Sequence, residues 1–195
     1  MDVALAVPAA LGGRHPSVHE VRRIGSRANG GAHELSDWDF SVEAHDFAAV
    51  ARDLPRLVAP LGAVAQQWDR FASHACYMLV LPGPAKIDLL FLDQKREWSP
   101  AWSVSPDTLD EIDVHFWDWI LWLEQKRRGG RDDVLQASLH DLQELLLRPI
   151  GAREEARSVA EATRAYLDAR SRLERGFGFE VPRELERVVL PVLDA

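Results

Sequence analysis

The chain has 195 residues and a formal net charge of −8, with 31 acidic side chains against 23 lysines and arginines. A general nucleic-acid binder is usually basic, so this charge argues against that class, although it leaves room for an enzyme with a local basic pocket. No apolar run approaches the length of a membrane span, the apolar residues 3–11 lack the basic start of a signal peptide, and Cys76 is the only cysteine, so no internal disulfide is possible. We therefore expect a cytoplasmic protein of one large domain or two small ones.

The first half of the chain predicts a sheet with one helix. A first strand is expected over residues 18–24, ending at the small-residue turn Gly25-Ser26. The apolar run from Cys76 is typical of a buried central strand, and we interpret this cysteine as a small buried hydrophobe rather than a catalytic thiol. The further strands that we expect span 37–44, 76–81 and 86–92, and 63–71 is expected to be a strand or an irregular edge. The helix spans 46–61, with Pro55 in its middle.

The second half predicts helices. The stretch 93–106, which carries Trp98 and Pro100, is expected to connect the two halves. Beyond it, apolar residues recur at helical spacing, and glycine pairs or prolines separate the segments. The helices that we expect span about 107–128, 132–147 and 153–174, with a short last helix after Pro182. This order of elements predicts an α+β chain.

Two carboxylates separated by one residue, Asp37 and Asp39, follow Ser26 after ten intervening residues. Alternate side chains of a strand share a face, so the two carboxylates are expected side by side, with Trp38 on the opposite face. Two anions about 4 Å apart repel each other by roughly 4 kcal/mol at an effective dielectric constant of about 20. The commonest reason for keeping such a pair is a hard cation such as Mg²⁺.

A third carboxylate, Asp88, lies inside the predicted strand 86–92, facing away from Ile87 and Leu89. An ionised Asp in such a strand is costly unless it is paired or binds a metal. If this strand lies beside that of Asp37, the three carboxylates converge on one face. Such a face suits two Mg²⁺ ions about 3.5–4 Å apart, as used in nucleotidyl transfer.

Gly25-Ser26, the Asp37-x-Asp39 pair and the later Asp88 together resemble the nucleotidyltransferase superfamily that shares its palm with DNA polymerase β. The resemblance covers residues 18–92 and extends to 107–195 only in architecture. There, the helical part is similar to that of the small antibiotic nucleotidyltransferases, which adenylylate aminoglycosides or lincosamides. The resemblance implies a mixed-sheet palm over 1–95 and a helical bundle over 106–195 on the acceptor side of a cleft.

The resemblance also implies a chemistry. Asp37, Asp39 and Asp88 would bind Mg²⁺, two ions in our interpretation, and Gly25 and Ser26 would contact the nucleotide phosphates. A nucleoside triphosphate, which we take to be ATP, would donate its nucleotidyl group to a hydroxyl of a small acceptor and release pyrophosphate. Catalysis of this kind is mostly positioning and charge stabilisation. The sequence leaves the acceptor, the nucleobase and the oligomeric state open.

Several polar residues near these motifs allow two interpretations. Ser36, which we group with Arg27 among the nucleotide-binding residues, either bonds a carboxylate or the loop backbone or serves simple turn chemistry. Arg27 and Asn29 either contact the nucleotide or remain solvated loop residues. Lys86 shares a face with Asp88, where it balances the carboxylates, touches a phosphate or stays a surface lysine.

The first helix of the second half supplies the candidates for a general base. Relatives use a carboxylate to deprotonate the acceptor hydroxyl, and Glu124, Asp113 and Asp118 are available here, although we interpret each as exposed helix-face charge. His115 is interpreted as a polar helix residue. On the same helix, Trp119 is expected in the buried stripe, and Trp117 and Trp122 are expected at the interface between the halves or in a substrate cleft. A basic cluster at the end of this helix is expected to contact triphosphate or to stabilise the helix terminus; it consists of Lys126, Arg127, Arg128 and Arg131.

Two alternatives stay open. The first is a nucleotidyltransferase that modifies a protein hydroxyl, as minimal members of the superfamily do to toxin partners; the added helical half argues against it. The second is a non-catalytic nucleotide-binding member of the fold, against which the complete carboxylate set argues.

Overall fold

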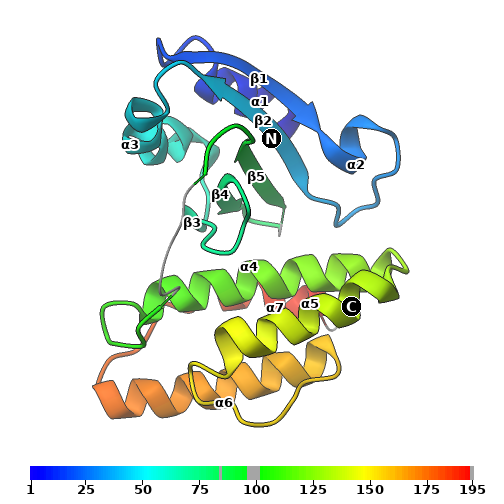
Figure 1. The fold of residues 1–195 in the computed structure, drawn as a ribbon, viewed down its shortest axis with the longest axis vertical. Coiled ribbons are helices and arrows are strands. Elements are labelled where there is room, and N and C mark those ends of the chain that lie inside the picture. Colours follow the sequence, from blue (N-terminus) through cyan, green and yellow to red (C-terminus); the bar gives the residue numbers. More distant parts are fainter. Residues whose placement is uncertain (84, 96–101, 194–195) are drawn as a thin grey trace. The chain divides into compact units, whose positions relative to one another are not determined.

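The computed structural model describes residues 1–83, 85–95 and 102–193. The chain divides into two compact units, Met1–Trp98 and Ser99–Ala195. Figure 1 shows the first unit, which carries the sheet, in blue to dark green, and the second, which is helical, in green to red. Among the residues that the structure describes, no helix is both long enough and apolar enough to span a membrane.

The first unit is built on a five-stranded sheet with the order β1-β2-β5-β4-β3. Its strands are β1 (Val18–Ile24), β2 (Trp38–Ala44), β3 (Ala65–Trp68), β4 (Ala75–Val80) and β5 (Lys86–Phe91). β2 and β5 are parallel, and the other neighbouring pairs are antiparallel. The sheet is therefore mixed, and the central strand β5 joins the hairpin β1–β2 to the antiparallel strands β4 and β3.

One face of this sheet forms the core of the unit. Helices α1 (Val3–Leu11) and α3 (Phe47–Val58) pack on it, followed by the 3₁₀ turn η1 (Ala59–Leu61). Because strand side chains alternate, the residues between the core positions lie on the other face, and these include Asp39 and Asp88. The core positions are Phe40 and Val42 of β2, Tyr77 and Leu79 of β4, Ile87, Leu89 and Phe91 of β5, Val7 and Leu11 of α1, and Val50, Leu54 and Val58 of α3.

The two covering helices begin at aspartate caps. Asp2 accepts a hydrogen bond from the Ala4 amide at 3.0 Å, and Asp46 accepts one from the Ala49 amide at 2.9 Å. Such caps satisfy backbone donors that the first turn leaves free. Each helix also contains a proline, Pro8 in α1 and Pro55 in α3.

The second unit consists of helices. Their bounds are α4 (Leu109–Arg128), α5 (Asp132–Leu142), the π-helical segment η2 (Gln143–Leu147), α6 (Val159–Phe177) and α7 (Glu184–Leu193). α4 packs against α5, α6 and α7. The predicted α+β class, a mixed sheet followed by C-terminal helices, is confirmed.

Three elements show the largest differences from the sequence-based expectation. Helix α1 was not predicted, because its nine residues are all apolar and show no polar face. β3 is shorter than the predicted 63–71, because Asp69 turns the chain by accepting hydrogen bonds from the amides of Phe71 and Ala72 at 2.7 and 3.2 Å. The predicted helix 153–174 begins only at Val159, since the Ser158 hydroxyl caps it through the Glu161 amide at 3.2 Å.

The predicted helix 132–147 also differs in form. It changes to a π-helix at Gln143, whose buried amide side chain bonds the Ala152 carbonyl at 3.5 Å and the Ala156 amide at 3.3 Å. Trp98 and Pro100 of the predicted connection lie outside the described residues.

Candidate functional site

Asp39 and Asp88 are aligned by the pairing of two strands. In the parallel register of β2 and β5, Asp39 lies directly opposite Asp88. Both side chains point away from the core, because their neighbours Phe40, Ile87 and Leu89 are fully buried in it. The fold thus brings together two carboxylates that are 49 positions apart in the sequence.

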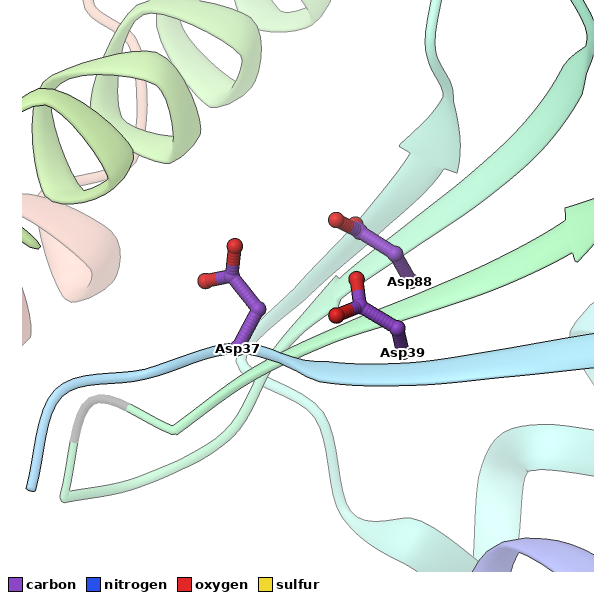
Figure 2. Close-up of side chains that lie close together, drawn as sticks. All are labelled: Asp37, Asp39 and Asp88. Atoms are coloured by element: carbon purple, nitrogen blue, oxygen red, sulfur yellow. The ribbon is translucent and has the colours of Figure 1, made fainter. Parts of the chain in front are cut away.

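Asp37 lies just before β2 and joins the same cluster. Carboxylate oxygens of Asp37, Asp39 and Asp88 all lie within 4.8 Å of one another, and Figure 2 shows the three side chains extending into one space. Asp37 is 6% exposed and Asp88 is 9% exposed, so part of this charge is removed from water. The convergence predicted from the sequence is therefore present as geometry.

The donor set fits a magnesium ion. All three groups offer the hard oxygen ligands that Mg²⁺ prefers, and two oxygens on one ion can lie at most about 4.2 Å apart, which is twice the Mg–O distance. Oxygens within 4.8 Å of one another need to close by only a few tenths of an ångström. Without a cation, mutual repulsion opposes that approach.

Lys86 is part of the cluster. Its ammonium group donates to both carboxylate oxygens of Asp88, at 2.5 Å each, and the lysine is only 5% exposed. Of the interpretations left open by the sequence, the surface lysine is wrong, because the side chain is buried against Asp88. Alternation along β5 explains this contact, since residues two apart share a face.

Gly25 packs directly against the Asp39 carboxylate. Its φ of +69° lies in the left-handed region, and a Cβ at this position would lie 2.0 Å from Oδ2 of Asp39. Only glycine satisfies both constraints without a shift of the backbone or of the carboxylate. The predicted turn at Gly25-Ser26 is in fact the start of a four-residue helix, α2 (Gly25–Ala28), which packs against β1 and β2.

Arg27 fastens the loop that carries Asp37. Its Nε donates to the Ser36 carbonyl at 2.8 Å and its Nη2 to the Glu34 carbonyl at 3.0 Å, while the guanidinium lies 4.2 Å from the Trp38 ring centre. Within the loop, the Ser36 hydroxyl accepts a hydrogen bond from the His33 amide at 2.9 Å. Arg27 and Ser36 thus order the loop before Asp37, and the bond of Ser36 to the loop backbone is one of the interpretations that the sequence left open.

Three acidic residues of α4 are buried, contrary to expectation. Asp113, Asp118 and Glu124 are 3%, 5% and 1% exposed, so the interpretation as exposed helix-face charge is wrong. The reason is that α4 packs against α5, α6 and α7 and so presents more than one face to the core. A single apolar stripe, as read from the sequence, does not describe such a helix.

Glu124, the candidate base, is paired with two arginines. Its carboxylate accepts from Arg127 at 2.6 and 2.7 Å and from Arg128 at 2.7 Å. Burial alone would raise the pKa of Glu124, but these hydrogen bonds and charges outweigh burial and lower it. A lowered pKa and occupied lone pairs argue against a general base and favour a structural ion pair.

The rest of the basic cluster is also engaged. Arg128 donates to the Val192 carbonyl, Arg131 lies 3.4 Å from Asp133, and Lys126 lies 4.5 Å from the Trp122 ring centre. These contacts favour the helix-terminus interpretation over a triphosphate contact.

Asp113, a second buried acid of α4, anchors a polar network that could not be predicted from the sequence. Asp113 accepts hydrogen bonds from Tyr166 at 2.5 Å, Arg170 at 2.9 Å and Trp117 at 3.2 Å. Burial raises the pKa of Asp113 despite these donors. The tyrosine and the arginine come from α6, 53 and 57 positions away, so only the folded chain reveals the network.

The aromatic residues of α4 are placed differently from the prediction. Trp117 is fully buried, whereas Trp119 is half-buried, so their expected roles are reversed. The buried indole N–H of Trp117 donates to Asp113 at 3.2 Å. His115 of α4 is buried too, with its ring 5.0 Å from that of Trp102 and 5.8 Å from that of Trp119.

Comparisons with known proteins give little beyond this geometry. No protein-family model matches the chain, and no curated protein matches it. Among solved structures, the chain is similar to an aminoglycoside 6-adenyltransferase from Bacillus subtilis, with 10% sequence identity over 95% of this chain and 94% of that chain. The TM-score is 0.31, and a likeness at this level carries no argument about activity.

Proposed function

We propose that this chain is a Mg²⁺-dependent nucleotidyltransferase that moves AMP from ATP to a hydroxyl of a small acceptor, such as an aminoglycoside-like antibiotic. The observation that carries this proposal is the carboxylate cluster, in which oxygens of Asp37, Asp39 and Asp88 lie within 4.8 Å of one another beside Gly25. The motif resemblance of the sequence gives the cluster its chemical meaning.

The proposal assigns a role to each candidate site residue of the first unit. Asp37, Asp39 and Asp88 hold the metal, which when bound neutralises the charge of the phosphates. Gly25 and Ser26 face the β- and γ-phosphates, and Arg27 and Ser36 hold the loop of Asp37 in place. The acceptor hydroxyl oxygen forms a bond to the α-phosphorus and gives up its proton to solvent, and the bond to the leaving pyrophosphate breaks. Glu124 is left out as a base because two arginines already hold it.

The test is a screen of the purified full chain with ATP, Mg²⁺ and a panel of aminoglycosides, lincosamides and other hydroxyl compounds, read by pyrophosphate release. Asp37→Asn should lower the rate by at least about a hundredfold, comparable to the loss of one donor to a transition state. Its unfolding transition should stay unchanged. The matched control is Asp93→Asn, an exposed aspartate of the same unit, which should keep the wild-type rate.

Three results would change or refute the proposal. Labelled protein, rather than labelled small molecule, after incubation with cell lysate and labelled ATP would identify a protein-modifying enzyme. Lack of Mg²⁺-dependent ATP binding in calorimetry would leave a member of the fold without catalytic function. Near-wild-type turnover by Asp37→Asn would refute the metal assignment.

A further inference from the structure

The contact between Lys86 and Asp88 places a positive charge inside the carboxylate cluster. The ammonium nitrogen lies 2.5 Å from both oxygens of Asp88, so one side of that carboxylate is fully taken up. A carboxylate has about four lone-pair sites on its two oxygens, and an ammonium that donates to both oxygens occupies two of these sites. Asp88 therefore has only its remaining sites for a metal ion.

The surroundings of Lys86 keep its ammonium in place. On β4, the residues opposite Lys86 and Asp88 are Val80 and Met78, which are 1% and 2% exposed. On the other side of β5, the register with β2 sets Asp39 opposite Asp88. A buried ammonium between an apolar strand and carboxylates is held there, because leaving them would remove its charge from its partners without giving it water.

The charges of the cluster suit one divalent ion. Before a nucleotide binds, the three carboxylates and the ammonium carry a net formal charge of −2, which a single Mg²⁺ balances. In two-metal sites the ions lie about 3.5–4 Å apart and clamp opposite sides of the reacting group. A second ion bridged by Asp88 would lie next to the ammonium of Lys86, and like charges at that distance repel each other.

We propose that Lys86 takes the place of a second metal ion: the site binds one divalent cation, held by Asp37, Asp39 and the remaining oxygen sites of Asp88, and the ammonium of Lys86 supplies the second positive charge. This inference rests on the proposed function and deepens it. It also replaces the two Mg²⁺ ions that the sequence resemblance implied with one ion and one lysine.

The experiment counts ions rather than turnover. The full chain is loaded with Mn²⁺ and α,β-methylene ATP, the number of ions per protein–nucleotide complex is determined by equilibrium binding, and electron paramagnetic resonance reports whether two ions are coupled. Wild type should bind one ion with an uncoupled spectrum. Lys86→Met should bind two ions with a coupled spectrum, because the place of the ammonium becomes free. Lys95→Met, which changes an exposed lysine of the same unit, should bind one.

The outcomes separate this inference from the proposed function. Two coupled ions in wild type that Asp37→Asn removes would overturn the role of Lys86 while leaving the metal-dependent function standing. A single ion in Lys86→Met would likewise overturn it. A single ion whose binding Asp37→Asn leaves unchanged would be held by the nucleotide alone, and would refute the metal site and the inference together. If Lys86→Met does not fold, the wild-type count still decides, and Lys86→Arg, which keeps the charge, should bind one ion.

Discussion

Gly25 and Asp39 share a contact that leaves no room for a side chain at position 25. A Cβ there would lie 2.0 Å from Oδ2 and 2.9 Å from Cγ of Asp39. The contact links the end of β1 to the carboxylate on β2, and it explains why glycine precedes Ser26 in this motif. The left-handed φ of +69° adds a second reason, since L-residues other than glycine pay about 1–2 kcal/mol there.

Gly25→Ala should therefore displace the Asp39 carboxylate. We expect a loss of about 1–3 kcal/mol in the free energy of unfolding from strain and overpacking. We also expect at least a tenfold loss of Mn²⁺ affinity, because the displaced carboxylate no longer meets its partners. Denaturant unfolding and Mn²⁺ titration measure the two effects.

The control for this prediction is Gly62→Ala. Gly62 has nearly the same φ, +68°, but nothing lies within 4 Å of the Cβ it would gain. The substitution should cost about 1–2 kcal/mol of stability through strain alone and leave Mn²⁺ affinity unchanged. Equal losses of affinity in the two variants would contradict the role of the Gly25–Asp39 contact.

The carboxylate cluster was predictable because each of its strands shows a recognisable local pattern. Asp37 and Asp39 follow the two-residue period of a strand, and Asp88 stands out as a charge among apolar neighbours. Their convergence needed only the pairing of β2 with β5, which the motif resemblance supplied. The contact of Lys86 with both oxygens of Asp88 follows the same period, yet the sequence did not distinguish it from a surface lysine, because burial depends on β4.

Arg27 is predicted to order the loop before β2 rather than to act as a free charge. Arg27→Met and Arg27→Lys should both speed amide hydrogen exchange at His33 and Ser36, because lysine cannot reproduce the two-donor fork that reaches the Ser36 and Glu34 carbonyls. The matched control is Arg23→Met, which should leave this exchange unchanged. The Arg23 guanidinium lies 6.0 Å from the centre of the same Trp38 ring. If amide exchange were faster in Arg27→Met but unchanged in Arg27→Lys, the positive charge alone, and not the two-donor fork, would order the loop.

Arg170 is predicted to be essential for the stability of the helical unit. Its guanidinium bonds Asp113 at 2.9 Å and Glu186 at 2.5 Å while only 3% exposed, so Arg170→Met leaves a buried carboxylate without its countercharge. Breaking a buried pair costs about 3–5 kcal/mol. Urea unfolding of Arg170→Met should show this loss, whereas Arg172→Met, an exposed neighbour on α6, should stay within about 0.5 kcal/mol of wild type. Similar stabilities of the two variants would contradict the structural role of the network.

The sequence could not predict this network for a physical reason. Burial of Asp113 depends on Tyr166 and Arg170, which lie on α6 and approach only when the helices pack. Periodicity along α4 indicates which apolar residues face inward, but it gives no sign that a charged residue finds partners on another helix. Acidic residues on a helix are usually exposed, so the general rule led to the wrong interpretation here.

Glu124 gives the last prediction, a stability that depends on pH. Its pKa in the folded chain is lowered from 4.5, because the two arginines outweigh the effect of burial. A lowered folded pKa means that the ionised form stabilises the fold above pH 4.5, and that this contribution is lost as the pH falls through the folded pKa. Glu124→Gln should therefore be less stable than wild type by about 1–2 kcal/mol at about pH 7, since it loses charged hydrogen bonds whose arginine partners stay partly solvated.

The difference between the two proteins should shrink as the pH drops, because protonated Glu124 resembles glutamine. Denaturant unfolding of wild type and Glu124→Gln at about pH 7 and about pH 3.5 measures this convergence. Glu144→Gln is the control: its pair with Arg148 is more exposed, with side chains 35% and 66% accessible, so its effect should stay below about 1 kcal/mol at both pH values. A Glu124→Gln difference that is constant with pH would show that the ion pair contributes nothing to folding, and would reopen Glu124 as a carboxylate free for catalysis.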